Sequence, residues 1–151
     1  MKKQSLHKAF TAIEIIIVLA IVAILVTAIV PTIRQYLPNV QLNGSSKNLV
    51  ANLREAQQRA ITEQNRYLVR FNSDAVPYHY SLIRILDSNE QEIRKIYLST
   101  NINLLVDSSI SGKQVIFSPD GGPSSSGNIT LSNNDAQKVI HISPAGFIRI
   151  E

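Results

Sequence analysis

Residues 10–30, FTAIEIIIVLAIVAILVTAIV, are the part of the sequence on which the interpretation of the fold depends. From Ile15 to Val30 the only residue that is not apolar is Thr27. As a helix, this segment would be roughly 31 Å long at about 1.5 Å per residue, and a bilayer core is about 30 Å thick. A helix also satisfies its own backbone hydrogen bonds in lipid. The sequence therefore predicts a transmembrane helix over residues 10–30.

The segment before this stretch is basic. Residues 1–9 contain Lys2, Lys3 and Lys8 and no acid. Of the 15 Lys and Arg residues, 12 remain after these three, against 11 Asp and Glu residues, so most of the net charge of +4 belongs to this terminus. Lys residues before an apolar stretch predict a cytoplasmic amino terminus and an extracytoplasmic carboxy-terminal domain.

Glu14 lies inside the apolar stretch, where a carboxylate costs a few kcal/mol and marks function by default. It follows Phe10 by four residues, so the two share a helix face. A cut between Ala9 and Phe10 would create an amine that could neutralise Glu14, within one subunit or between neighbours. The alternative is a secretory signal peptide cleaved after Ala28, but the apolar stretch is long for one and Glu14 argues against it.

The segment 8–14, KAFTAIE, resembles the type III signal of type IV prepilins and type II secretion pseudopilins. The resemblance implies that a prepilin peptidase cuts between Ala9 and Phe10 and methylates the Phe10 amine, and that Glu14 guides docking into the filament. Phe10, Thr11 and Glu14 match the family pattern. Ala9 stands where the family usually has Gly, and because alanine is also small we expect cleavage.

Pro31 also fits this resemblance, because pilins commonly carry a proline where the helix leaves the membrane. The partners that the resemblance implies are other pilin or pseudopilin subunits, prepilin peptidase, the inner-membrane assembly platform and membrane lipid. The implied location is the cytoplasmic membrane before assembly and the pilus or pseudopilus afterwards. Together the features predict a leader at residues 1–9 and an assembly helix at residues 10–30.

Residues 31–66 are predicted to form an extracytoplasmic amphipathic helix. We expect Pro38 to interrupt it and residues 43–46, NGSS, to be a weak point. Beyond them an apolar stripe recurs every three or four residues. The stripe consists of Leu49, Val50, Leu53, Ala56, Gln57, Ala60 and Ile61. The opposite face is expected to be solvated, and it carries Arg54, Glu55, Gln58, Arg59 and Glu63.

Residues 67–151 change to a period of two, which is typical of strands. The predicted strands are 67–72, 78–86, 93–98, 101–106, 114–118, 128–132, 138–143 and 147–150. Short strands with tight turns imply one antiparallel sheet or two small ones. With the helix packed on this β-rich globular domain, the predicted fold class is α+β, the pilin fold.

The carboxy-terminal half resembles the GspH/FimT-like minor pseudopilins. The resemblance rests on residues 53–61 (LREAQQRAI), 115–121 (VIFSPDG) and 142–149 (ISPAGFIR). It implies a minor filament subunit of a type IV pilus or a type II secretion system, assembled through its amino-terminal helix.

The sequence gives no support for an enzyme or a cofactor. It has no Cys and no G-x-S-x-G or H-E-x-x-H pattern. His79 and His141 lie in alternating strand patterns, where a half-buried or surface histidine is the usual interpretation.

The alternative function is DNA binding during uptake, since some FimT-like minor pilins use a Gly-Arg-x-Arg element in the last strand. Here Gly146 is followed by Phe147, and only Arg149 is retained. Arg149 and Lys138 are the candidate DNA contacts. Because phosphate affinity grows with the number of cations, nucleic acid is disfavoured as a partner.

Overall fold

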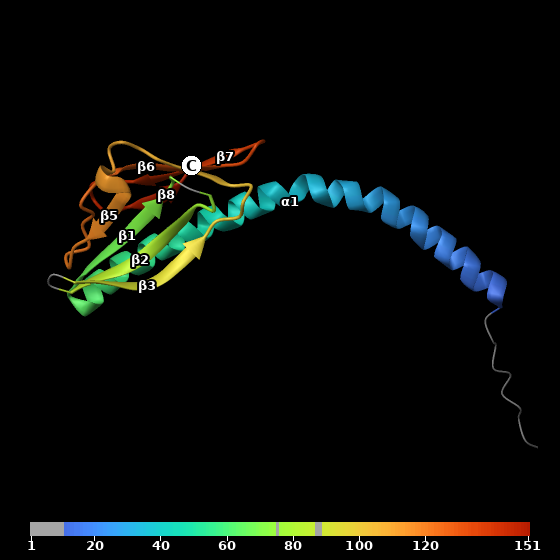
Figure 1. The fold of residues 1–151 in the computed structure, drawn as a ribbon, viewed down its shortest axis with the longest axis horizontal. Coiled ribbons are helices and arrows are strands. Elements are labelled where there is room, and N and C mark those ends of the chain that lie inside the picture. Colours follow the sequence, from blue (N-terminus) through green and yellow to red (C-terminus); the bar gives the residue numbers. More distant parts are fainter. Residues whose placement is uncertain (1–10, 75, 87–88) are drawn as a thin grey trace, which may run out of the picture. The chain divides into compact units, whose positions relative to one another are not determined.

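The computed structural model describes residues 11–74, 76–86 and 89–151. The chain divides into two compact units between Leu37 and Pro38, which we call the amino-terminal unit and the globular unit. Each is described by itself. The helix α1, Ala12–Glu63, contributes residues to both units (Figure 1).

The expected interruption of the helix at Pro38 is wrong, because the backbone is helical there. Residues 43–46, which were expected to be a weak point, are helical as well. Pro38 removes one N–H donor and Gly44 costs about 1 kcal/mol relative to Ala. Burial of Leu42 and Leu49 offsets these costs. The hydroxyl of Ser46 is also satisfied within the helix, since it donates to the Leu42 carbonyl at 2.8 Å.

The helix ends three residues before the predicted end at residue 66. Gln64 adopts a φ of +51°, a left-handed conformation that stops a helix. Arg66 already belongs to the first strand.

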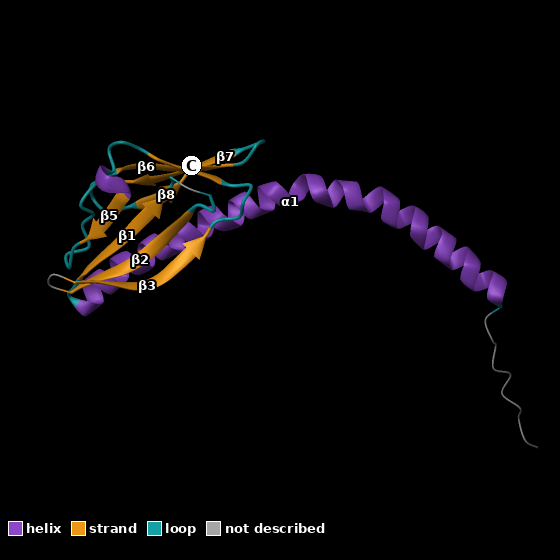
Figure 2. Ribbon diagram, in the orientation of Figure 1, coloured by secondary structure: helices purple, strands orange, loops and turns teal. Residues whose placement is uncertain are grey.

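The globular unit contains two antiparallel sheets of four strands each (Figure 2). Sheet A has the order β3-β2-β1-β5, and sheet B has the order β4-β6-β7-β8. The strands are β1 Arg66–Asn72, β2 His79–Leu86, β3 Asn89–Tyr97, β4 Asn103–Val106, β5 Gln114–Phe117, β6 Gly127–Ser132, β7 Gln137–Ile142 and β8 Ile148–Ile150. A 3-10 turn, Ser111–Lys113, precedes β5. All eight predicted strands are confirmed, with shifted ends. The sequence left open whether they form one sheet or two, and the described strands form two.

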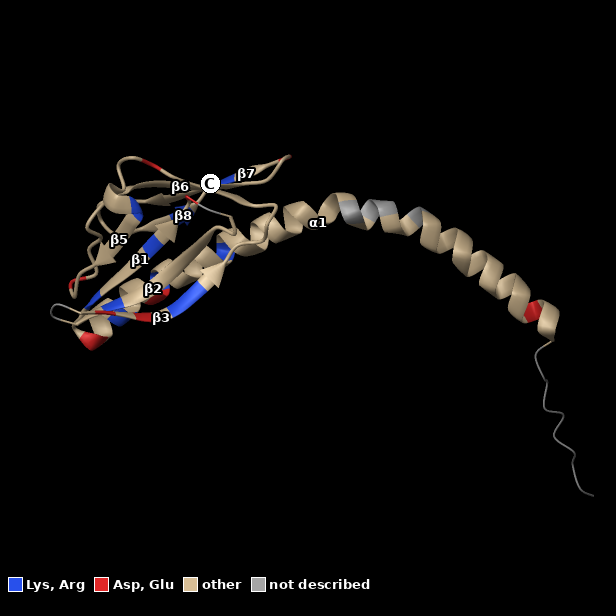
Figure 3. Ribbon diagram, in the orientation of Figure 1, with Lys and Arg blue, Asp and Glu red and all other residues tan. Residues whose placement is uncertain are grey.

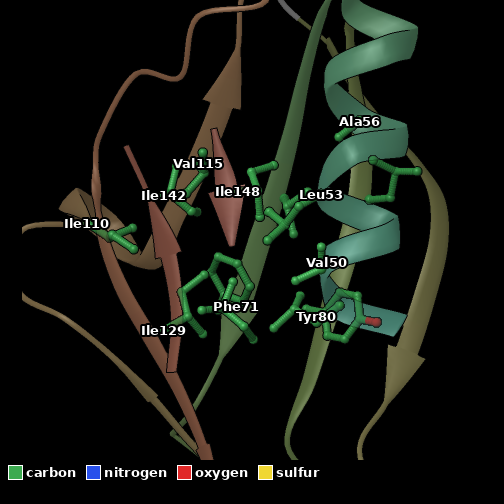
Figure 4. Close-up of a cluster of buried hydrophobic side chains, with 14 of the residues drawn as sticks. Val50, Leu53, Ala56, Phe71, Tyr80, Ile110, Val115, Ile129, Ile142 and Ile148 are labelled. Carbon is green, nitrogen blue, oxygen red and sulfur yellow. The ribbon is translucent and has the colours of Figure 1, made fainter. Parts of the chain in front are cut away.

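One hydrophobic core joins the helix and both sheets (Figure 4). From α1 it takes Leu49, Val50, Leu53, Ala56 and Ala60. Sheet A contributes Tyr67, Val69, Phe71, Tyr80, Leu82, Val115 and Phe117, and sheet B contributes Leu104, Ile129, Leu131, Ile140, Ile142 and Ile148. The predicted α+β class is therefore confirmed.

Candidate assembly and binding surfaces

Thr11 and Glu14 form the start of α1. The N–H of Glu14 lies 3.3 Å from Thr11 Oγ1 and 3.1 Å from the Thr11 carbonyl, which also accepts from Ile15 at 3.3 Å. Thr11 is thus the N-cap, and Glu14 stands three positions later, the spacing of a capping box. A carboxylate in the first turn also interacts favourably with the helix dipole. This cap was not predicted, although the T-x-x-E spacing indicates it.

The amino-terminal unit exposes apolar side chains on every side of the helix. Every Ile, Leu and Val from Ile13 to Val30 is at least 40% exposed. A helix that is apolar all round requires another apolar environment to cover it. Among the residues that the structure describes, no helix meets the requirements of length and apolarity for a membrane span.

Of the other sites predicted in this region, some lie within the described residues and some lie outside them. Ala9 and Phe10, the predicted cleavage pair, lie outside them. Pro31 lies within α1, where its backbone is helical.

The polar face of α1 in the globular unit is exposed at Arg54, Gln58 and Glu63, as expected, and it also forms ion pairs with sheet A. Glu55 Oε1 lies 3.0 Å from Arg59 and 3.3 Å from Arg94 of β3, a strand that carries both signs of charge (Figure 3). Glu63 accepts the Tyr67 hydroxyl at 2.6 Å and lies 3.4 Å from Arg84. Burial raises the pKa of Tyr67, and the hydrogen bond to Glu63 raises it further.

Gln57 joins the three segments that carry the GspH/FimT resemblance. Its Nε2 donates to the carbonyl of Gly121 at 2.8 Å and to that of Gly146 at 3.1 Å. Both glycines are buried turn residues with left-handed φ angles of +85° and +81°. A Cβ on Gly146 would lie 2.7 Å from Gln57 Nε2. Gln57 was predicted as part of the apolar stripe, and nothing in its sequence position signals this role.

The two candidate DNA contacts are not brought together. Lys138 stands opposite Leu131, whose side chain is in the core, whereas Arg149 stands opposite His141. Directly opposed residues share a sheet face, and faces alternate along a strand. Positions 138 and 141 therefore have opposite orientation, so Lys138 and Arg149 belong to opposite faces of sheet B.

Two pockets lie between α1 and β8 in the globular unit. The larger, about 600 Å³, is lined by Arg54, Gln57, Gln58, Ser143, Gly146, Phe147, Ile148 and Arg149. The smaller, about 340 Å³, is lined by Lys47, Val50, Ala51, Arg54 and Ile150. They share Arg54, whose Nη2 donates to the Ile148 carbonyl at 2.9 Å. We call the combined surface the β8 groove.

Comparison with solved structures supports the fold. The type IV minor pilin FimU of Pseudomonas aeruginosa is 20% identical, with a TM-score of 0.63, over 75% of this chain and 90% of that chain. The minor pseudopilin EpsH of the Vibrio cholerae type 2 secretion system is 14% identical, with a TM-score of 0.61, over 74% of this chain and 96% of that chain. At these identities the likeness shows a shared fold.

Comparison with curated proteins gave no match. The family model described as type II transport protein GspH matches residues 45–146, which is more than half of the sequence. This range includes α1 from Ser45 onward, both sheets as far as β7, and the Gln57 junction. The chain therefore belongs to the GspH family of type II transport proteins and has the α+β pilin fold.

Proposed function

We propose that this protein is a minor pilin or pseudopilin, a filament subunit of a type IV pilus or a type II secretion system. The observation that carries the proposal is the combination of a GspH-family globular unit with a helix whose Ile, Leu and Val side chains from Ile13 to Val30 are exposed among the described residues. Packing such helices together in a filament core would bury these side chains. The contribution is about 25 cal/mol for each Å² of apolar surface removed from water.

Before assembly, the apolar helix would store the subunit in the cytoplasmic membrane with the globular unit outside. No described helix meets the requirements for a span, so this step rests on the sequence of residues 10–30 and the basic leader before them. Membrane fractionation of cells that express the chain tests it. Recovery in the membrane pellet after a carbonate wash supports an inserted helix, and release into the supernatant contradicts it.

Processing at Ala9 and Phe10 is the next step. Prepilin peptidase would remove residues 1–9 and methylate the new amine of Phe10. Mass spectrometry of the mature amino terminus is the direct test. An N-methylated Phe10 supports the proposal, whereas a mature protein that starts near Ile29 would identify an ordinary secreted protein.

Docking through Glu14 is the last step, in which its carboxylate pairs with a Phe10 amine. Glu14→Gln removes the charge, yet Gln is also accepted at the third position of a capping box. We expect this variant to reach the membrane normally and to be absent from sheared filaments, as we expect for Glu14→Ala. Thr11→Ala is the control, because it removes the capping oxygen but keeps the carboxylate. Normal incorporation of Glu14→Gln would refute docking through the charge.

A further inference from the structure

The β8 strand has a free edge that faces the β8 groove. It is the last strand of sheet B, and among the described residues it pairs only with β7. Val139 and Glu151 exchange two backbone hydrogen bonds, at 2.8 and 3.3 Å. Because hydrogen-bonded and non-hydrogen-bonded pairs alternate in an antiparallel ladder, the backbone polar groups of Ile148 and Ile150 point away from β7.

Only one of these outward groups has a partner in the described part of the chain. It is the Ile148 carbonyl, which accepts from Arg54. The N–H groups of Ile148 and Ile150 and the Ile150 carbonyl have none there. A row of unpaired backbone groups is a ready template for another strand.

The groove is long enough for a short strand. Its lining on α1 runs from Lys47 to Gln58, a distance of about 16 Å at about 1.5 Å per residue. An extended chain rises about 3.3 Å per residue, so about five residues span this length. Such a strand would displace Arg54 from the Ile148 carbonyl, which frees both groups for the incoming chain.

The side chains around the groove indicate which kind of strand would fit. Lys47, Arg54 and Arg149 are the ionisable residues of the lining, which contains no acid. Glu151 follows Ile150 in the chain but lines neither pocket. Apolar surface is also open, since Phe147 is 70% exposed and Ile150 is 37% exposed.

We propose that the β8 groove binds an extended acidic segment of another protein, which adds to sheet B as a strand beside β8. Backbone hydrogen bonds to the outward groups of Ile148 and Ile150 supply affinity. Carboxylates facing Lys47, Arg54 and Arg149 supply specificity, and apolar side chains between them cover Phe147 and Ile150. This contact uses the globular unit alone, so it can be tested independently of filament assembly through the amino-terminal helix.

The test uses the full-length chain in detergent and a fluorescein-labelled peptide, acetyl-Glu-Val-Glu-Val-Glu-Val-Glu-amide, followed by fluorescence anisotropy. Two further peptides have the same sequence with N-methyl groups on alternate amides, one for each of the two possible alternating patterns. Each pattern blocks strand pairing along one edge of the peptide. We expect at least one N-methyl pattern to weaken binding tenfold or more. A peptide with Lys in place of each Glu is expected not to bind.

Two variants locate the site. Ile150→Pro removes an outward N–H without removing a bond to β7, and proline is tolerated on edge strands. Arg149→Glu reverses one charge of the groove. Each is expected to weaken binding of the acidic peptide about tenfold. Arg66→Glu is the matched control, because it makes the same charge change at an exposed position of β1 and should leave binding within twofold.

Three results would overturn the proposal. Equal binding of both N-methyl patterns and the unmodified peptide would mean that charge alone holds the ligand. Equal weakening by Arg66→Glu and Arg149→Glu would mean that the site lies elsewhere. Salt-sensitive binding of a single-stranded oligonucleotide with no binding of the acidic peptide would assign the groove to nucleic acid. The N-methyl comparison uses the unmutated chain, so it decides the matter even if Ile150→Pro does not fold.

Discussion

Replacing Gln57 by Leu tests whether one side chain holds the two closing turns of the globular unit on the helix. The substitution removes the hydrogen bonds to Gly121 and Gly146, at 2.8 and 3.1 Å. Each such bond contributes about 0.5–1.5 kcal/mol net. Gly146 lines the groove, whereas Gly121 does not. Both glycines are buried, and an unpaired buried acceptor costs about 1–3 kcal/mol.

Added packing of the Leu side chain offsets part of this loss, so we expect a destabilisation of about 2 kcal/mol. At roughly 4 °C per kcal/mol for a unit of this size, the melting temperature should fall by about 8 °C. Urea unfolding in detergent, followed by tyrosine near-UV circular dichroism, measures the change, because Tyr67 and Tyr80 are buried in the globular unit. With a urea dependence of about 2 kcal/mol per M, the midpoint should fall by about 1 M.

Gln58→Leu is the matched control. It makes the same chemical change one residue later, at an exposed position that donates no hydrogen bond within the described residues. We expect its free energy of unfolding to stay within about 0.5 kcal/mol of the parent. If Gln57→Leu and Gln58→Leu differ by less than that, the junction does not stabilise the fold and the reasoning is refuted.

Three further predictions concern the same unit. Gly146→Ala should destabilise it by about 2 kcal/mol or more in the same urea assay, because it places a Cβ at a φ of +81° and 2.7 Å from Gln57 Nε2; a neutral result would mean that the turn relaxes freely. Leu53→Ala should cost about 2–5 kcal/mol, because Leu53 is fully buried between the helix and the sheets, and a loss under 1 kcal/mol would contradict that placement. The pKa of Tyr67 is raised in the folded state, so its contribution to stability is complete below the unfolded pKa of about 10 and is lost as the pH rises through the folded pKa. Tyr67→Phe should therefore flatten the decline of unfolding free energy above pH 10, and an unchanged alkaline slope would exclude Tyr67 as its source.

The sequence predicted the local features of this protein well. The period of two in residues 67–151 located all eight strands, and the three- and four-residue spacing from Leu49 to Ala60 identified the buried face of the helix. Ile61, the last residue of the predicted stripe, is 46% exposed. These patterns depend on residues that are close in the sequence, so a single sequence is enough to predict them. The failures came where tertiary contacts compensate for local costs. Pro38 and Gly44 weaken a helix in isolation, yet burial of Leu42 and Leu49 keeps the backbone helical around them.

What the sequence by itself determined is the α+β class, the position of the apolar helix with Glu14, and the positions of the strands along the chain. Only the tertiary structure decided which strands pair, because register depends on residues far apart in the chain. That register places Lys138 and Arg149 on opposite faces of sheet B. It also leaves the β8 edge open beside Arg54 and brings Gly121 and Gly146 to the same amide of Gln57. Gln57 lies 64 residues from Gly121 and 89 from Gly146, a separation at which no local pattern can signal contact.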